Sequence, residues 1–173
     1  MSQLVCSTCR ATYPLNDVRW KCDCGGALDI EFAPVFDRKQ IKSRKPTMRR
    51  AREALPLDSD ANIVSLGEGF TPLVEMDFGG RTVLIKQDQL FPTGSYKDRG
   101  AALLISKVKE LGVQRVVEDS SGNAGCAVAA YCARAGVACE IFVPEDTAAA
   151  KLAQITAYGA ALNKVPGSRE DTA

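Results

Sequence analysis

The second half of the chain alternates apolar strand-like segments with helical segments, and this alternation constrains the fold more than any other feature. A helical spacing begins at Lys97 and runs to Leu111, and Gly112 follows as the expected C-terminal cap. The segments expected after it are strands at 113–117, 138–143 and 162–165, and helices at 127–135 and 147–158. Short connections between such segments predict an α/β fold with a doubly wound parallel sheet and right-handed crossovers.

The sequence contains no histidine, which limits the chemistry that the chain can perform. Catalytic pairs and metal sites that depend on an imidazole are excluded. The 22 Lys and Arg residues against 21 Asp and Glu residues give a net charge of +1, so no overall field favours nucleic acid or a membrane surface. There is no apolar stretch long enough to span a bilayer and no signal-peptide pattern at the N-terminus. We therefore expect a cytoplasmic protein.

Four of the seven cysteines form two pairs near the N-terminus: Cys6 with Cys9, and Cys22 with Cys24. Two thiolate pairs separated by a short hairpin can bind one tetrahedral zinc ion, and without histidine the site has to be all-cysteine. The spacing predicts a structural zinc ribbon over residues 1–32. Disulfides and idle thiols are the alternatives, and a cytoplasmic setting and the paired spacing argue against them.

One feature of this cysteine pattern departs from the usual zinc ribbon. The second pair has one residue between its cysteines, where most ribbons have two. The pattern of alternating residues at 28–32 is typical of a short strand that would belong to the ribbon. The remaining cysteines are expected to be small buried hydrophobic residues: Cys126, Cys132 and Cys139.

Residues 33–62 contain a strongly basic run, with eight cations within the 15 positions 38–52. These are Arg38, Lys39, Lys42, Arg44, Lys45, Arg49, Arg50 and Arg52. A nucleic-acid interface is one interpretation. However, no aromatic side chain lies among the charges to stack on bases, and acidic residues follow soon after. We therefore predict a solvated connector with one short helix.

The segment Pro-Thr-Gly-Ser-Tyr-Lys-Asp-Arg-Gly at 92–100 places Lys97 where a loop gives way to a helix. The positive end of the helix dipole disfavours the protonated form of a lysine in the first turn. Partial burial would lower the pKa of Lys97 further, and a neutral amine is the form that attacks an aldehyde. From position alone, a solvated lysine at a helix start is the alternative.

A second small-residue loop, Ser-Ser-Gly-Asn-Ala-Gly at 120–125, leaves a strand and opens a helix. Such a loop presents free backbone amides to an anion, and Gly122 and Gly125 would let that anion approach closely. The loop does not match the phosphate-loop or dinucleotide-binding patterns. A tight strand-to-helix turn with no ligand is the alternative.

The lysine segment closely resembles the cofactor-lysine motif of threonine synthases, which are pyridoxal-phosphate enzymes of fold type II. The Gly-Glu-Gly-Phe-Thr-Pro-Leu segment at 67–73 and the loop at 120–125 resemble the same family. The resemblance implies that Lys97 binds pyridoxal 5'-phosphate and that Asn123 contacts the phenolic oxygen of this cofactor. It also implies a loop that holds the α-carboxylate of an amino-acid substrate: Ser120, Ser121, Gly122, Asn123 and Ala124.

The family resemblance further implies an organisation and an activity. The expected parts are a zinc ribbon at 1–32, a connector at 33–62, the start of the large domain at 63–112 and an incomplete small α/β domain at 113–173. The expected reaction is that of a lyase, which converts O-phosphohomoserine and water to threonine and phosphate. The resemblance is compatible with a homodimer of the complete enzyme.

The sequence departs from the family at several points. Phe91 stands where asparagine is usual, Tyr96 where phenylalanine is commoner, and no glycine-rich phosphate cup follows Asn123. We therefore expect an N-terminal portion of the enzyme that is inactive by itself. Threonine dehydratase and cysteate synthase remain alternatives within the fold, and a non-catalytic zinc-ribbon docking module remains one outside it.

Overall fold

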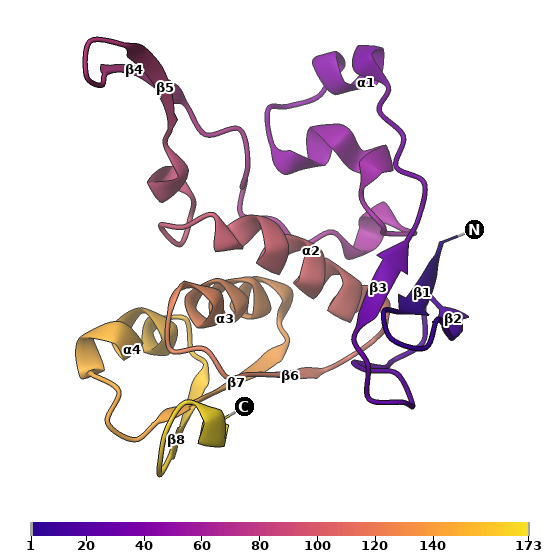
Figure 1. Ribbon diagram of the computed structural model, residues 1–173, viewed down its shortest axis with the longest axis vertical. Helices are drawn as coiled ribbons and strands as arrows, with labels where there is room; N and C mark the ends of the chain where they lie inside the picture. Colours follow the sequence, from indigo (N-terminus) through magenta and orange to yellow (C-terminus); the bar gives the residue numbers. More distant parts are fainter. Residues whose placement is uncertain (1, 173) are drawn as a thin grey trace.

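A computed structural model describes residues 2–172 and shows three separate β-sheets joined by helices (Figure 1). The N-terminal sheet consists of β1 (Gln3–Cys6), β2 (Thr12–Pro14) and β3 (Leu28–Glu31), all antiparallel in the order β2-β1-β3. The strand expected at 28–32 is thus confirmed as β3. Cys6 ends β1, and the other three paired cysteines lie in the loops of this small sheet.

The segment after β3 contains one α-helix, α1 (Arg38–Ser43), as the sequence indicated, and two 3-10 helices. These are η1 (Met48–Ala54) and η2 (Asp60–Asn62). The Asp37 side chain caps α1 by accepting hydrogen bonds from the backbone N–H groups of its first turn. The backbone N–H of Met48 donates to the carbonyl of Glu68 at 2.8 Å, which ties η1 to the loop at 67–73.

The prediction of a solvated connector holds for only half of the basic run. Four of the cations are exposed, whereas the other four are partly buried: Arg44, Arg49, Arg50 and Arg52. Arg49 keeps only 13% of its side chain exposed and donates hydrogen bonds to the Val64 carbonyl at 2.8 Å and to Ser106 Oγ at 3.1 Å. Arg44 forms an ion pair with Glu53 at 2.6 Å, and Arg52 forms one with Asp60. The physical reason is that Arg44 and Arg52 pair with carboxylates of the same connector, whereas Arg49 binds groups as distant in the sequence as Ser106.

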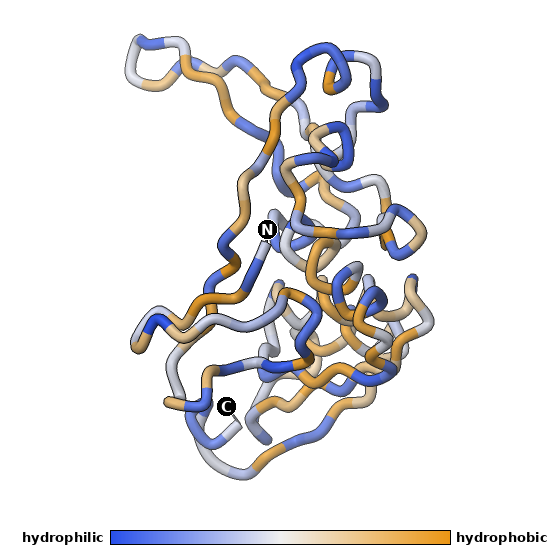
Figure 2. Tube along the Cα trace, turned by 90° about the vertical axis from the view of Figure 1, so that its right-hand side faces the viewer, coloured by the Kyte–Doolittle hydropathy of each residue, from blue (hydrophilic) through white to orange (hydrophobic). Residues whose placement is uncertain are grey.

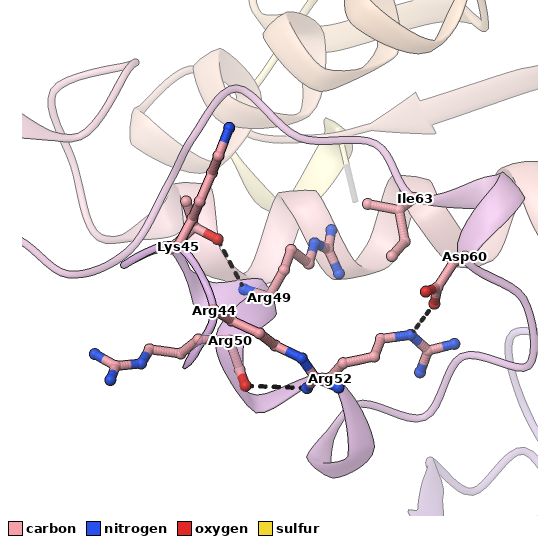
Figure 3. A pocket seen from close by; sticks show the side chains of 8 residues that line it. Arg44, Lys45, Arg49, Arg50, Arg52, Asp60 and Ile63 are labelled. Carbon is pink, nitrogen blue, oxygen red and sulfur yellow. Dashed lines mark hydrogen bonds and ion pairs between the residues drawn. The ribbon is translucent and has the colours of Figure 1, made fainter. Parts of the chain in front are cut away.

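The same arginines line a pocket of about 330 Å³ (Figure 3). The guanidinium groups of Arg49 and Arg50 point in different directions in this view. Arg50 is further occupied by stacking on Phe70, with 4.5 Å between its guanidinium carbon and the ring centroid. Four arginines of the basic run thus make internal contacts, while its lysines stay exposed.

A two-stranded hairpin projects from the body of the molecule at the upper left of Figure 1. It consists of β4 (Leu73–Asp77) and β5 (Thr82–Lys86). All residues of both strands except Val83 are exposed. The short helix η3 (Asp88–Leu90) then leads into the lysine segment.

The remainder of the described chain is the α/β part that the periodicity predicted. Its elements are α2 (Lys97–Glu110), β6 (Arg115–Glu118), α3 (Asn123–Ala135), β7 (Ala138–Pro144), α4 (Ala149–Ala157), β8 (Ala161–Val165) and η4 (Glu170–Thr172). The three strands are parallel in the order β6-β7-β8. The main difference is that α3 begins four residues earlier than expected, because the loop residues from Asn123 onward form its first turn.

The core lies between the helices and this parallel sheet. Ala101, Ala102 and Ile105 of α2 pack against a face of α3 that includes Ala127 and Tyr131, and Ile105 and Tyr131 are fully buried. Figure 2 shows hydrophobic residues along this lower part of the molecule and also along the projecting upper part. As expected, Cys126 and Cys132 are buried, whereas Cys139 is half-buried. Within residues 2–172, no helix is both long and apolar enough to cross a membrane.

The ion pair between Arg44 and Glu53 predicts a pH-dependent contribution to stability. The Arg44 guanidinium lowers the pKa of Glu53 from its ordinary value of 4.5 to about 2. A carboxylate with a depressed pKa stabilises the fold above its ordinary pKa, and this contribution is lost as the pH falls toward the folded-state value. The loss of unfolding free energy in Glu53→Gln should therefore be largest at neutral pH and shrink between pH 4.5 and pH 2.

Urea unfolding of both proteins at several pH values measures this difference. Glu75→Gln, on the exposed strand β4, is the matched control and should differ little from the wild type at any pH. A Glu53→Gln difference that stays constant across the range would contradict the assignment.

Candidate functional site

The lysine segment is held in place by a buried carboxylate. Asp98, fully buried in the first turn of α2, accepts a hydrogen bond from the backbone N–H of Thr93 at 2.9 Å and another from the Thr93 hydroxyl. The Ser95 hydroxyl accepts a hydrogen bond from the backbone N–H of Lys97 at 3.3 Å. An acidic group at a helix N-terminus also interacts favourably with the helix dipole. These contacts fix the backbone that carries Lys97.

Lys97 is the first residue of α2, as the sequence predicted, and its side chain is exposed. The Nζ atom lies 5.2 Å from the centroid of the Tyr96 ring. The burial that would favour a neutral amine is therefore not provided by residues 2–172 in this structure. The amine is accessible to a ligand that approaches from solvent.

A second set of contacts fastens the loop before Lys97. Asp88 accepts hydrogen bonds from the Thr71 hydroxyl at 2.8 Å and from Arg99 Nη2 at 3.0 Å. The Arg99 guanidinium carbon lies 5.0 Å from the centroid of the Phe91 ring, and Phe91 is buried. Phe91, the departure from the family pattern, thus has a packing role beneath Arg99. Sequence reasoning gave no role to Asp88, which precedes the recognised motif, or to Arg99, which lies within it.

The small-residue loop ends at Gly122, which is the N-cap of α3 and supplies no capping side chain. The first backbone N–H groups of a helix have no intrahelical acceptor, so this helix start suits an anion. Asn123 is exposed at the first position of α3, and Ser120 and Ser121 are half-buried before it. The geometry is compatible with the expected carboxylate-binding role of residues 120–124, which stays a prediction.

Gly125 has a different role from the one expected. A Cβ atom at this position would overlap the backbone carbonyl of Ser120, and its next contact would be Ile155 Cδ1 at 3.4 Å. Gly125 therefore permits close packing of α3 against its own entry loop. The idea that Gly125 opens the backbone to an anion is wrong, because the space is filled by the chain itself.

The structure brings the starts of α2 and α3 to one end of the sheet. The two helices lie side by side and both begin near the carboxyl end of β6 (Figure 1). Burial and the adjacent Asp119 carboxylate raise the pKa of Glu118, the last residue of β6, while the positive charges of Arg169 and Lys97 act in the opposite direction. Lys97 and the loop at 120–125 therefore belong to one region, as ligand sites in α/β sheets do.

A buried polar cluster around Glu68 connects the loop at 67–73 with α3. Sequence reasoning did not find this cluster. Glu68, 1% exposed, accepts hydrogen bonds from Tyr131 Oη at 3.0 Å and from the backbone N–H of Leu66 at 2.9 Å. The Arg49 Nε atom lies 3.8 Å from the other carboxylate oxygen. Burial and the Glu68 charge raise the pKa of Tyr131, so its hydroxyl stays protonated. The only sequence signal was the position of Glu68 between two glycines.

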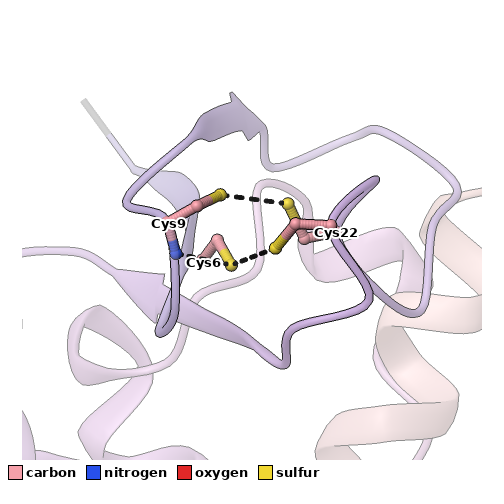
Figure 4. A group of neighbouring side chains, drawn as sticks. Cys6, Cys9 and Cys22 are labelled. Carbon is pink, nitrogen blue, oxygen red and sulfur yellow. Dashed lines mark hydrogen bonds between the residues drawn. The ribbon is translucent and has the colours of Figure 1, made fainter.

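The four predicted cysteine ligands converge in the N-terminal sheet (Figure 4). All four sulfur atoms lie within 4.8 Å of one another, with Cys6 to Cys24 and Cys9 to Cys22 each at 3.6 Å. Zinc–sulfur bonds of about 2.3 Å in a tetrahedron place the sulfurs about 3.8 Å apart, so the cluster fits a zinc ion.

Backbone N–H groups stabilise the thiolate form of Cys6, which is the form that binds a metal cation. The backbone N–H groups of Thr8 and Cys9 both donate to Cys6 Sγ at 3.4 Å. The hydrogen bond from Cys9 is the main cause that lowers the pKa of the Cys6 thiol to about 6. A Cβ atom at Gly26 would lie 2.8 Å from Cys6 Sγ, so only glycine fits there. The backbone of both cysteine loops thus lies in close contact with the Cys6 sulfur.

The parallel α/β sheet, with a lysine at one helix start and a small-residue loop at the next, defines an α/β enzyme fold of the kind that binds pyridoxal phosphate. The chain belongs to the family of pyridoxal-phosphate dependent enzymes, whose sequence profile matches residues 64–173. Lys97 and the loop at 120–125 both lie inside the matched region. The fold class expected from the sequence, fold type II, is confirmed by this match and by the solved structures that resemble the chain.

The relatives extend the similarity to the N-terminal part. The chain is 36% identical to the threonine synthase of Methanocaldococcus jannaschii over 96% of its own length and 44% of that protein. It is 32% identical to the threonine synthase of Methanosarcina acetivorans over 99% of its length and 44% of that protein. The serine racemase of Dictyostelium discoideum superimposes with a TM-score of 0.54 at 34% identity, over 59% of this chain and 35% of that one. The chain thus spans less than half the length of these relatives.

The close packing at Gly125 predicts a selective effect of one added methyl group. Gly125→Ala should lower the unfolding free energy by about 1–3 kcal/mol, because an overpacked site has to displace the Ser120 carbonyl. Gly122→Ala is the matched control, since the nearest atom to its Cβ would be Ser120 Oγ at 3.9 Å. Denaturant unfolding of both variants tests this, and equal stabilities would contradict it.

The cysteine cluster predicts stoichiometric metal binding. Protein purified under reducing, zinc-replete conditions should contain one equivalent of zinc, because the four sulfurs form one closed site. Cys9→Ser should release the metal and disorder residues 1–32 while the α/β part stays folded. Metal analysis and amide exchange measure both effects. Cys126→Ser, at a buried cysteine outside the cluster, is the control and should retain the metal.

Proposed function

We propose that this chain supplies the lysine-bearing part of a threonine synthase, which converts O-phosphohomoserine and water to threonine and phosphate. The observation that carries the proposal is the placement of Lys97 at the start of α2, next to the small-residue loop at the start of α3. The similarity to two archaeal threonine synthases over nearly the whole chain favours this reaction over others of the same fold.

The exposed groups at the two helix starts fit part of pyridoxal phosphate. The Lys97 amine is exposed and would be accessible to the cofactor aldehyde, and the exposed Asn123 amide would donate to the cofactor's phenolic oxygen. When bound, pyridoxal phosphate supplies an electron sink for the bonds at the substrate's α-carbon. Lys97 would hold the cofactor and afterwards move protons, and the amides of residues 120–124 would orient the substrate carboxylate.

The cofactor phosphate is the group that these residues do not fit. A dianion is usually held by several converging backbone amides, and no glycine-rich cup follows Asn123 in this sequence. We therefore propose that the chain alone binds pyridoxal phosphate weakly and does not release phosphate from O-phosphohomoserine. Threonine dehydratase and cysteate synthase chemistry would use the same lysine and loop, so the substrate decides between them.

The zinc ion belongs to the same proposal as a structural element. Four cysteine ligands leave no open coordination position, so the metal would stabilise residues 1–32 and would not bind substrate. We place the protein in the cytoplasm, where the four thiols stay reduced. The proposed partner is a small amino-acid substrate, and a homodimer is proposed only for a protein of the relatives' length.

A chimaera tests the reaction directly. Residues 1–173 would replace the matching segment of the Methanocaldococcus jannaschii threonine synthase, so that the rest of the site comes from the relative. We expect phosphate release from O-phosphohomoserine, and Lys97→Ala should reduce it to background, because the amine is lost. Borohydride reduction followed by peptide mass spectrometry should find the cofactor on Lys97. Lys86→Ala, at the exposed end of β5, is the control and should retain activity.

The outcomes separate the alternatives. If the cofactor is found on Lys97 but no phosphate is released, the threonine synthase assignment would be wrong, and another reaction of the same fold would be favoured. Cofactor fixed on Lys86 or Lys107 would show that the wrong lysine was assigned. Phosphate release by the unfused chain, after host enzymes are excluded, would show that the phosphate site lies within these 173 residues.

A further inference from the structure

One side chain outside the four cysteines contacts the cluster directly. Tyr13, at the centre of β2, places its Oη atom 3.0 Å from Cys22 Sγ. Among residues 2–172, the other hydrogen bonds to these four sulfurs come from backbone N–H groups or from another cysteine of the cluster. Tyr13 is therefore the one non-cysteine side chain that forms a hydrogen bond with a sulfur of the cluster in the described chain.

The position of the Tyr13 ring is fixed from several sides. Tyr13 is half-buried and pairs with Leu4 in the antiparallel register of β1 and β2. The Arg19 guanidinium carbon lies 3.7 Å from the ring centroid. Arg19 is itself held by Asp17 at 2.8 Å and by Asp23 at 3.1 Å. The ring therefore has little freedom to turn its hydroxyl away from the cluster.

The direction of the hydroxyl proton follows from the available acceptors. A thiolate that binds a metal only accepts hydrogen bonds, so Tyr13 has to be the donor toward Cys22. The competing acceptor, Asp23 Oδ2, lies farther away at 3.3 Å. The backbone N–H of Asp23 donates a hydrogen bond to Tyr13 Oη at 3.5 Å, so the oxygen acts as acceptor there. The shorter contact directs the proton to the sulfur.

We propose that Tyr13 is a positioning residue of the metal site, whose hydroxyl donates a hydrogen bond to the Cys22 thiolate and slows loss of the metal. The inference rests on the proposed zinc site. In this role the hydroxyl of Tyr13 on β2 orients Cys22, the first cysteine of the more closely spaced pair. Removing a hydrogen-bond partner of a metal ligand typically weakens metal binding by about 10- to 100-fold.

Release of zinc from the purified full chain tests this role. Tyr13→Phe keeps the ring and its stacking with Arg19 and removes only the hydroxyl. We expect zinc to transfer to an excess of a coloured chelator about tenfold faster from Tyr13→Phe than from the wild type. Tyr158→Phe removes a hydroxyl near Gln154, remote from the cluster, and should release zinc at the wild-type rate.

Cobalt substitution gives a readout that a general loss of stability would not move. A hydrogen bond to a thiolate stabilises the sulfur electrons, so its removal should shift the sulfur-to-cobalt charge-transfer absorption of Tyr13→Phe to lower energy. Incorporation of 3-fluorotyrosine at position 13 keeps the oxygen and makes the hydroxyl a stronger donor. This protein should release zinc more slowly than the wild type and absorb at higher energy.

The results distinguish failure of the role of Tyr13 from failure of the proposed zinc site. A wild-type chain without one equivalent of zinc would overturn the metal site itself. Wild-type zinc binding combined with unchanged release from Tyr13→Phe would overturn the role of Tyr13 alone. Faster release with an unchanged cobalt spectrum would also overturn it, because the effect would then be structural. Should Tyr13→Phe take up no metal, the 3-fluorotyrosine protein decides: release no slower than wild type would overturn the inference.

Discussion

The packing of α2 against α3 is the contact on which the rest of the α/β part depends. Small side chains at Ala101, Ala102 and Ala127 let the two helices approach closely, and Ile105 and Tyr131 fill the space between them. Because β6 returns the chain between the two helices, they run in the same direction. Their positive ends therefore lie at one edge of the sheet, where a loop can present free amides and Lys97 its amine.

Buried polar contacts then fix the loops that this packing leaves at the edge. Asp98 holds Thr93 within its own loop, whereas Glu68 reaches Tyr131, 63 positions away in the sequence. A buried carboxylate is costly without partners, so each of these groups requires the correct arrangement of several segments. Arg49 contributes to the same arrangement by binding Val64 and Ser106. The connector is thus part of the structure that supports the candidate site.

These two kinds of contact explain what could be predicted from the sequence. Helical and strand periodicity is local, so α2, β7 and β8 were found within a few residues, and the paired spacing of the cysteines located their cluster. The role of Arg49 could not be found, because a basic run looks the same whether its partners are water or carbonyl groups from distant loops. Gly125 was misinterpreted for a similar reason: the atom that excludes a Cβ belongs to Ser120, and only the path of the backbone shows it.

The position of the ribbon along α2 separates the roles of the two candidate centres. Leu4 and Leu15 of the ribbon share an apolar groove of about 690 Å³ with Val108 and Leu111, near the C-terminal end of α2. Lys97 begins the same helix, and a helix of 14 residues is about 20 Å long at about 1.5 Å per residue. A metal held in the ribbon therefore acts at the end of α2 opposite to the amine. We therefore expect the metal to influence chemistry at Lys97 through the stability of the ribbon and through its packing near the far end of this helix.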